Sequence, residues 1–333
     1  MISQAKIRSF LANPGHRRKI IGILKLVLLL FLGWAIYQQV FRREDLNDII
    51  NGFAMNFRWK NAPWFVLCLI LMPLNWGLET EKWRILLRPE LILPFRRALA
   101  GILTGISVSL FTPNRIGEYG GRLLLIPADK SWLGLAATLT GNIAQWIILL
   151  IGGLWGAAMV GPKLLPWMED LPGWYSSVLW GGVTILPILY TQMGRLTNWL
   201  KSRNWRKLRQ WRQWPKLEQA LIGYKKGKLI AILVIAFCRY LIYSSQYLFL
   251  LYAFGVEVNA MEGLAGIALI FLIQSSVPLP PFMALVARGE LAVLLWASYG
   301  ANELAVLAST FSLFIINLLI PALLGGAAIV KIK

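Results

Sequence analysis

Histidine and cysteine, the side chains on which many catalytic and metal sites depend, are almost missing from this sequence. The 333 residues include one histidine, His16, in the basic N-terminal tail, and two cysteines, Cys68 and Cys238, in separate apolar runs. A catalytic triad or a histidine metal cluster is therefore excluded. The cysteines are interpreted as buried side chains rather than as a disulfide or a metal pair. We expect no metal and no cofactor.

Charged residues are also scarce, and acidic ones most of all. Charged side chains make up 15% of the chain and hydrophobic ones 57%, and 34 Lys and Arg outnumber 15 Asp and Glu, giving a net charge of +19. This composition excludes a soluble globule and predicts an all-α integral membrane protein whose solvent is the lipid bilayer. The bases lie in short segments beside apolar runs, as in cytoplasmic loops, so we expect no nucleic-acid partner.

Apolar runs in the sequence predict about six transmembrane helices. A hydrocarbon core of about 30 Å requires roughly 20 helical residues. Bases without acids in residues 1–19, and eleven bases against one acid in residues 195–228, place both segments in the cytoplasm. We therefore predict a multi-pass protein of the cell inner (cytoplasmic) membrane with both termini cytoplasmic. The predicted helices cover residues 20–40, 63–80, 131–160, 174–194, 229–253 and 303–329.

The basic segment 195–228 also contains tryptophans at near-helical spacing, among them Trp199, Trp205 and Trp211. This pattern predicts a helix in the headgroup layer with its cations toward anionic lipid. An ordinary cytoplasmic loop with aromatic anchors explains the pattern equally well.

A charged stretch from Thr112 to Arg122, broken by Pro113 and Gly117, lies between two apolar runs that are too short to span. Non-helical backbone at membrane depth is tolerated only where protein or a water cavity satisfies its polar groups. We therefore predict a re-entrant helical hairpin over residues 98–126, in which Pro113 and Gly117 break the helix.

A second broken stretch contains Pro278 and Pro280 and is followed by Arg288 and Glu290. It predicts a second re-entrant hairpin, over residues 261–297. The order helix, helix, hairpin, helix then occurs twice, in halves of opposite orientation at about 1–165 and 170–333. Such inverted repeats are typical of secondary transporters, with the substrate site where the broken helices meet. The two halves form one membrane domain, residues 1–333.

The first hairpin supplies the main candidate site residues. Arg115 and Glu118 lie three residues apart, on one face of a helical turn. One interpretation is an ion pair that fixes the hairpin tip. The other is that Arg115 binds a lipid phosphate through its planar fork while Glu118 orients it or exchanges a proton. Arg122, one turn further, is either a second cation or a side chain that extends to the cytoplasmic surface.

Arg239 is a lone guanidinium inside the predicted helix 229–253 and needs a partner. We expect that partner to be Glu290 or Glu118. Arg288 and Glu290 are included as substrate-binding candidates of the second hairpin. Several amides in apolar helices are interpreted mainly as helix–helix contacts, and Asn142 is also kept as a candidate substrate contact. These amides are Asn142, Gln145, Gln246, Gln274 and Asn317.

Three segments resemble the transmembrane region of lysylphosphatidylglycerol synthase and flippase proteins. They are EKWRILL at residues 81–87, TPNRIGE at 112–118, similar to the family's T-P-x-R-x-G-E, and INLLIPALLG at 316–325. The resemblance implies a flippase-like membrane protein and substrate contacts at the first hairpin. Here Pro278 and Pro280 precede Arg288-Gly289-Glu290, whereas many members have a Gly-rich stretch ending in Glu. Because the sequence ends at Lys333, we expect no aminoacyl-lipid synthesis by a following soluble domain.

Three functions remain open from the sequence. The first is a lipid translocase that moves an anionic phospholipid or a polyprenyl-phosphate type of lipid through a polar cavity between the hairpins. The second is a membrane-embedded enzyme acting on a lipid phosphate, which would normally need a metal or a histidine. The third is a non-transporting scaffold or accessory subunit. The sequence does not decide the oligomeric state, and a homodimer is one possibility.

Overall fold

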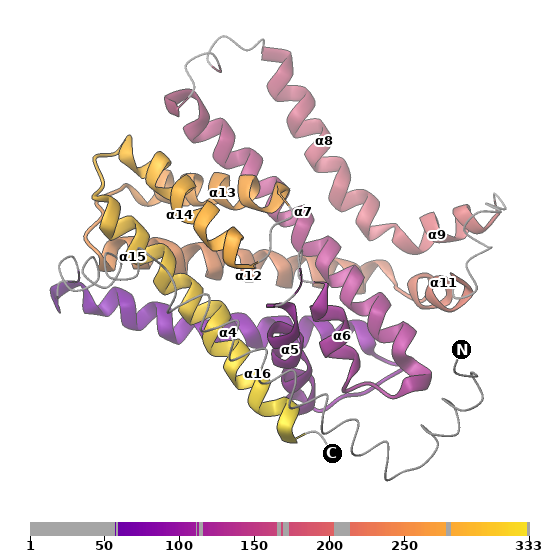
Figure 1. The fold of residues 1–333 in the computed structure, drawn as a ribbon. Coiled ribbons are helices and arrows are strands. Elements are labelled where there is room, and N and C mark those ends of the chain that lie inside the picture. Colours follow the sequence, from indigo (N-terminus) through magenta and orange to yellow (C-terminus); the bar gives the residue numbers. More distant parts are fainter. Residues whose placement is uncertain are drawn as a thin grey trace, which may run out of the picture.

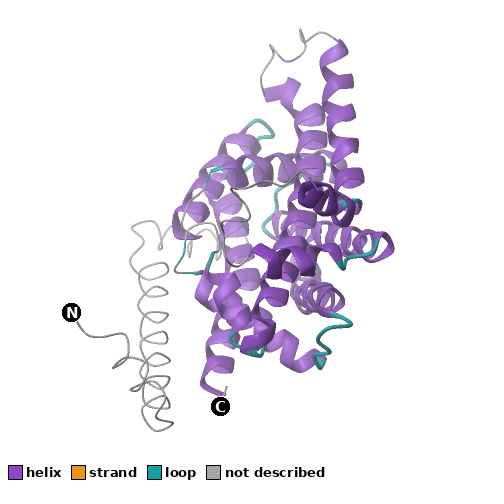
Figure 2. Cartoon of the chain, turned by 90° about the vertical axis from the view of Figure 1, so that its right-hand side faces the viewer, coloured by secondary structure: helices purple, strands orange, loops and turns teal. Residues whose placement is uncertain are grey.

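The computed structural model describes residues 57, 59–110, 112, 116–164, 168, 173–202, 214–277 and 281–331. In this part of the chain all regular structure is helical (Figures 1 and 2). The predicted first helix, residues 20–40, lies outside the described residues. The helices are α4 (Ala62–Leu87), α5 (Phe95–Ser109), α6 (Gly117–Leu123), α7 (Ser131–Leu164), α8 (Gly173–Thr191), α9 (Met193–Ser202), α11 (Trp214–Ile222), α12 (Lys226–Ala253), α13 (Ala260–Ser276), α14 (Pro281–Ala297), α15 (Glu303–Phe314) and α16 (Ile320–Lys331).

Within the described residues, four helices are long and apolar enough to cross a membrane. They are candidate membrane spans and coincide with four of the predicted spans, at residues 63–80, 131–160, 229–253 and 303–329. The predicted span 174–194 corresponds to α8, of which the shorter apolar segment Trp180–Thr191 is described in full. The molecule is therefore a multi-pass helical membrane protein. The four long helices are Trp59–Leu87, Ala128–Leu164, Lys226–Ala253 and Glu303–Ile329.

Helices α4 and α12 form an antiparallel pair at the centre of the described fold (Figure 1). Residues later in α4 contact residues earlier in α12, as in any antiparallel helix pair. Near the start of α4, Asn61 donates to the Tyr252 carbonyl over 3.0 Å, and further on the Cys68 carbonyl accepts from Gln246 over 2.9 Å. The predicted helix–helix role of Gln246 is confirmed by this contact.

The first broken stretch forms two short helices, α5 and α6, that pack closely. A Cβ on Gly121 would lie 2.6 Å from the Gly105 Cα, so a larger residue at position 121 would push α6 away from α5. Gly117 is the first residue of α6, and its amide donates to the Thr112 hydroxyl over 2.7 Å. This bond satisfies one of the free amides at the helix start. Pro113 lies outside the described residues.

The second broken stretch forms α13 and α14. The Gln274 amide of α13 donates to the Ala284 carbonyl of α14 over 3.0 Å and ties the two helices together. Pro278 and Pro280 lie outside the described residues, between the two helices. Their predicted role as helix breakers stays a prediction.

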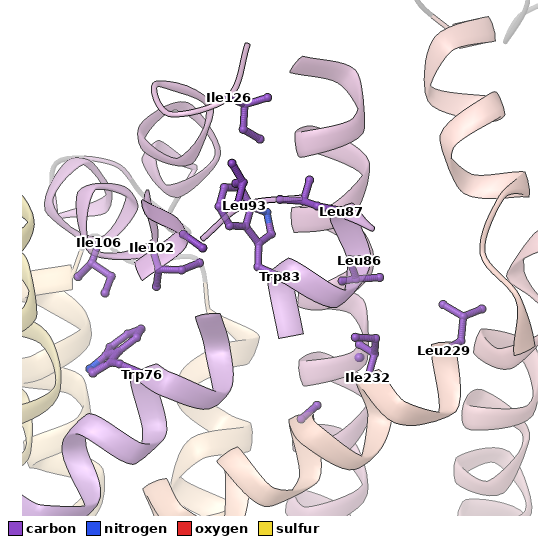
Figure 3. Close-up of a cluster of buried hydrophobic side chains, with 14 of the residues drawn as sticks. Trp76, Trp83, Leu86, Leu87, Leu93, Ile102, Ile106, Ile126, Leu229 and Ile232 are labelled. Atoms are coloured by element: carbon purple, nitrogen blue, oxygen red, sulfur yellow. The ribbon is translucent and has the colours of Figure 1, made fainter. Parts of the chain in front are cut away.

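Two large groups of buried apolar side chains pack the described helices together. One surrounds Trp76 and Trp83 of α4 and includes Ile102 and Ile106 of α5 and Ile232 of α12 (Figure 3). The other lies among α12, α13, α14 and α15, with Tyr247, Phe271 and Trp296 among its members. Helix α4 therefore contributes its aromatic side chains to the packing on which α5 and α12 rest.

A π-helical turn, Ile315–Leu319, joins α15 to α16. Pro321 follows it and has no N–H to donate to the carbonyl four residues earlier, which accounts for the wider turn. Asn317 lies in this turn and is 5% exposed. Its Oδ1 accepts from the Asn75 amide of α4 over 3.3 Å, so the turn contacts the central helix pair.

Candidate functional site

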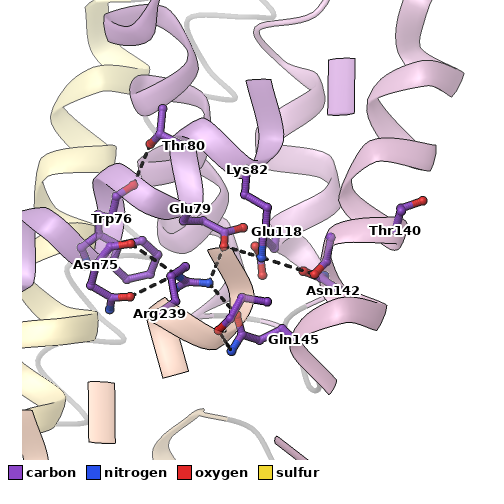
Figure 4. Close-up of polar contacts among 12 residues, drawn as sticks. Asn75, Trp76, Glu79, Thr80, Lys82, Glu118, Thr140, Asn142, Gln145 and Arg239 are labelled. Atoms are coloured by element: carbon purple, nitrogen blue, oxygen red, sulfur yellow. Dashed lines mark hydrogen bonds and ion pairs between the residues drawn. The ribbon is translucent and has the colours of Figure 1, made fainter. Parts of the chain in front are cut away.

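Five charged side chains form a buried charge cluster where α4, α6 and α12 meet. Figure 4 labels Glu79, Lys82, Glu118 and Arg239 among them. Four of them are almost inaccessible, with exposed side-chain fractions between 1% and 8%, and that of Arg239 is 14%. Charges at such depth are costly, and in membrane proteins they usually mark a functional site. The buried charge cluster consists of Glu79, Lys82, Glu118, Arg122 and Arg239.

The spacing along α4 places three polar side chains on one face. Asn75, Glu79 and Lys82 are separated by four and three residues, and side chains at this spacing lie above one another on a helix. All three are at most 2% exposed. Helix α4 therefore presents a polar stripe to its neighbours although its sequence is largely apolar.

Glu79 is the centre of the buried charge cluster because both of its carboxylate oxygens are bound by cations. Oε1 accepts from the Arg122 guanidinium over 2.7 Å. Oε2 lies 2.7 Å from Lys82 Nζ and also pairs with the Arg239 guanidinium. A single carboxylate thus joins α6 and α12 to α4.

Glu118 and Arg122 form a second ion pair, within α6, four residues apart. The close approach of α6 to α5 brings this pair inward, because a Cβ on Gly105 would lie 3.1 Å from Arg122 Cγ. Small residues at this contact therefore position the arginine as well as the helix. Arg122 contacts two carboxylates, those of Glu79 and Glu118.

Neutral groups complete the surroundings of the cations. Arg239 Nε donates to the Asn75 side-chain oxygen over 3.0 Å, and its NH1 donates to Gln145 Oε1 of α7 over 3.2 Å. Lys82 Nζ donates to the Gly141 carbonyl of α7 over 3.3 Å. The buried charge cluster is therefore fixed from α7 as well.

Each of the two guanidinium groups also lies near an indole of α4. The Arg122 Cζ atom is 5.8 Å from the centre of the Trp83 ring, and that of Arg239 is 5.6 Å from the centre of the Trp76 ring. Cation–π contacts of this kind stabilise a desolvated cation by about 2 kcal/mol or more. They help to explain how three cations are tolerated beside two carboxylates.

Of the residues predicted from the sequence, the structure brings Glu118, Arg122 and Arg239 together in the buried charge cluster. Asn142 lies on α7 beside α6, where its amide donates to the Tyr119 hydroxyl over 3.2 Å. Arg115 lies outside the described residues, so its predicted pairing with Glu118 stays a prediction.

The second-hairpin candidates do not share contacts with the buried charge cluster among the described interactions. Arg288 of α14 donates to Gln274 and Tyr243. Glu290 lies two residues further along α14, on roughly the opposite side of the helix, and is exposed.

Three sequence interpretations need correction. Arg239 pairs with Glu79, a residue that we did not select, because α4 and α12 run antiparallel and bring the two side chains to the same level. Arg122 does not extend to the surface: it is 1% exposed and bound to two carboxylates. Lys82, which lies beyond the end of the predicted helix 63–80, is inside α4 and is 1% exposed, because Glu79 provides it with a partner one turn earlier.

The signal for Glu79 and Lys82 was present as an acid and a base three residues apart at the end of an apolar run. Such a pair can neutralise itself on one helix face and remain buried. Among the described residues, no three His, Cys, Asp or Glu side chains are grouped so that they could hold a metal ion. The buried charge cluster itself offers cations and carboxylates for ionic contacts and hydrogen bonds.

The fold and this cluster define a multi-pass helical membrane protein with a charged site inside its helix bundle. Comparison with protein families then gives the family: residues 21–325 match the lysylphosphatidylglycerol synthase TM region. The chain belongs to this family, as the resemblance of its three motifs implied. A search of curated proteins found no match to the chain.

Proposed function

We propose that this protein is a lipid translocase. It moves an anionic lipid or a lipid-linked headgroup across the cytoplasmic membrane and catalyses no covalent reaction. The headgroup passes through the protein while the acyl chains stay in the bilayer. Membership of the lysylphosphatidylglycerol synthase TM region family supports a role in lipid handling.

The observation that carries this proposal is the composition of the buried charge cluster. Its five described members comprise three cations and two carboxylates, a formal charge of +1. A buried excess of positive charge is stabilised by an anion, and a guanidinium binds a phosphate through two parallel hydrogen bonds. The headgroup of an anionic lipid provides such a phosphate.

The proposed residue roles follow from their place around the buried charge cluster. Arg115 and Arg122 bind the phosphate from the first hairpin, and Arg239 binds it from α12. Glu118 holds Arg122 when the site is empty and releases it to the incoming phosphate. Asn142, beside α6 on α7, contacts the polar part of the headgroup.

The proposal includes two re-entrant hairpins, α5–α6 and α13–α14, related by an inverted repeat. Reciprocal packing supports it: α7 packs on α13, the first helix of the second hairpin, and α16 packs on α5, the first helix of the first. Glycines mediate both contacts, since a Cβ on Gly156 would overlap the Ala265 carbonyl and one on Gly325 the Leu103 carbonyl. In this arrangement both termini are cytoplasmic.

Reconstitution in liposomes tests the proposed function. The full chain is placed in phosphatidylcholine vesicles that carry a small amount of fluorescent phosphatidylglycerol in both leaflets, and a membrane-impermeant reductant is added outside. We expect the protein to expose the inner-leaflet fraction to the reductant, whereas protein-free vesicles protect it. Equal protection in both samples, for phosphatidylglycerol and for a polyprenyl phosphate probe, would contradict the proposal.

A further inference from the structure

Arg288 of α14 is a partly buried guanidinium outside the buried charge cluster. Its Nε donates to Gln274 Oε1 of α13 over 2.6 Å, and its NH1 donates to the Tyr243 hydroxyl of α12 over 3.0 Å. Its Cζ atom lies 5.5 Å from the centre of the Phe271 ring. Within the described part of the chain, all of its recorded contacts are with neutral groups.

This environment differs from that of the other two buried arginines. Arg122 and Arg239 each contact the Glu79 carboxylate, whereas no carboxylate is paired with Arg288 among the described residues. A guanidinium keeps its charge in proteins and has five N–H groups, of which two are used here. The remaining three are available to an anion, and charged side chains inside a membrane usually have a charged or polar partner.

The surroundings of Arg288 hold it in one orientation. The Gln274 amide nitrogen donates to the Ala284 carbonyl, so its oxygen is directed toward Arg288. The ring of Tyr243 stacks on that of Phe271 with centroids 5.1 Å apart, and Phe271 is 5% exposed. Three helices therefore fix the arginine before any ligand binds, which lowers the entropy lost on binding.

The position of Tyr243 connects Arg288 to the buried charge cluster. Tyr243 follows Arg239 by four residues on α12, so the two side chains lie on the same face of the helix. The rise between them is about 6 Å. An anion bound at Arg288 would therefore lie within roughly one helical turn of α12 from the level of Arg239.

We propose that Arg288 is a second anion seat, which binds a phosphate group carried by a membrane lipid, and that Tyr243 and Gln274 are positioning residues for it. The planar fork of arginine matches a phosphate through two hydrogen bonds. This inference rests on the proposed translocase function and adds to it a second anion-binding site outside the buried charge cluster. A headgroup then has two successive binding places along α12.

Equilibrium binding tests the seat separately from lipid movement. The full chain is placed in phosphatidylcholine nanodiscs, and fluorescent phosphatidylglycerol is titrated into them. We expect Arg288→Gln to weaken binding about tenfold or more, as for the loss of a charged hydrogen-bonded contact. The matched control is Arg97→Gln, which removes an exposed cation of α5 and should change the affinity by less than about twofold.

Tyr243→Phe tests the positioning role without removing a charge. The ring stays stacked on Phe271 and only the hydroxyl is lost, so we expect an unchanged melting temperature and binding about five- to tenfold weaker. Combined with Arg288→Gln, it should cause no further loss, because the hydroxyl acts through the guanidinium. A purely structural hydroxyl would instead lower the melting temperature and add its effect in the double variant.

The source of the phosphate is tested with inorganic phosphate in the same nanodiscs. Arg288-dependent binding of inorganic phosphate as tight as that of phosphatidylglycerol would overturn the assignment to a lipid. Equal affinity of Arg288→Gln and Arg97→Gln for phosphatidylglycerol would overturn the seat, even if the wild type moves lipid. If Arg288→Gln does not fold, unchanged binding by both Arg288→Lys and Tyr243→Phe overturns it. Arg288-dependent binding without lipid movement would support the seat and reject the translocase.

Discussion

Glu79 of α4 and Arg239 of α12 form a buried ion pair although 160 residues separate them in the sequence. The pair joins the two central helices at the level where α6 also enters through Arg122. The charged site is therefore part of the packing of the fold, and its members are expected to affect both stability and lipid binding.

Replacing Glu79 by Gln should strongly destabilise the protein. The change leaves three buried cations with one carboxylate among the cluster members, and breaking a buried pair costs about 3–5 kcal/mol. Lys82→Met is the matched variant, since it removes a cation from the same helix face and leaves Glu79 with two guanidinium groups. We expect it to lower the melting temperature in detergent less than Glu79→Gln does. Equal or larger destabilisation by Lys82→Met would contradict the central role of Glu79.

The existence of the long helices could be predicted from apolar runs, because hydropathy depends only on local sequence. The predicted helix ended at residue 80, whereas α4 continues to Leu87. The prediction ended early because a lysine beside an apolar run is normally taken to lie in water, and Lys82 is buried. Its partner Glu79 lies one turn earlier, and the contact of that carboxylate with Arg239 depends on the pairing of α4 with α12. Contacts over such sequence distances have no local signature.

The candidate site was predicted only in part, because several of its contacts join residues that are far apart in the sequence. Glu118, Arg122 and Arg239 stood out as charges in apolar surroundings, and the structure brings them together. The predicted partner of Arg239 was wrong because the sequence does not show which residues of α4 and α12 lie at the same level. Tyr243 was missed because tyrosine in an apolar helix is ordinary, and only its contact with Arg288 distinguishes it.

Glycines at the α5–α6 contact give a second prediction, on stability. Gly121→Ala should destabilise the protein by about 1–3 kcal/mol, because the added Cβ meets the backbone of Thr104 and Gly105. Gly120→Ala is the control, since nothing lies within 4 Å of a Cβ at that position. Thermal unfolding of the two variants side by side measures the difference. Equal stability of the two would show that α6 does not pack on α5 in this way.

Arg115→Lys should impair lipid movement about tenfold while leaving the melting temperature unchanged. Lysine keeps the charge but loses the planar fork that binds a phosphate through two hydrogen bonds. Arg97→Lys, at an exposed position of α5, serves as the control. Transport by Arg115→Lys at the rate of that control would reject a direct contact between Arg115 and the phosphate.

The basic segment at residues 195–228 gives a prediction on lipid preference. Neutralising the exposed bases Arg195, Lys225 and Lys226 to Gln should weaken the interaction with anionic vesicles by about 1 kcal/mol for each base near the surface. Retention of phosphatidylglycerol by the purified protein, compared with phosphatidylcholine, measures this preference. The difference should shrink as salt is added, because exposed charges are screened. Equal retention of both lipids by the wild type would reject the prediction.

The central claim is that the buried charge cluster binds the moving headgroup, and the double variant Glu118→Gln/Arg122→Gln tests it most directly. This variant removes both ion pairs of Arg122, leaves the formal charge of the cluster unchanged, and avoids a lone buried charge at either position. Its melting temperature and its rate of phosphatidylglycerol movement are measured in the same liposomes as those of the wild type. We predict a folded protein that moves phosphatidylglycerol at least tenfold more slowly, by about 1.4 kcal/mol or more in the barrier. A folded double variant that moves the lipid at the wild-type rate would show that the pair only supports the fold.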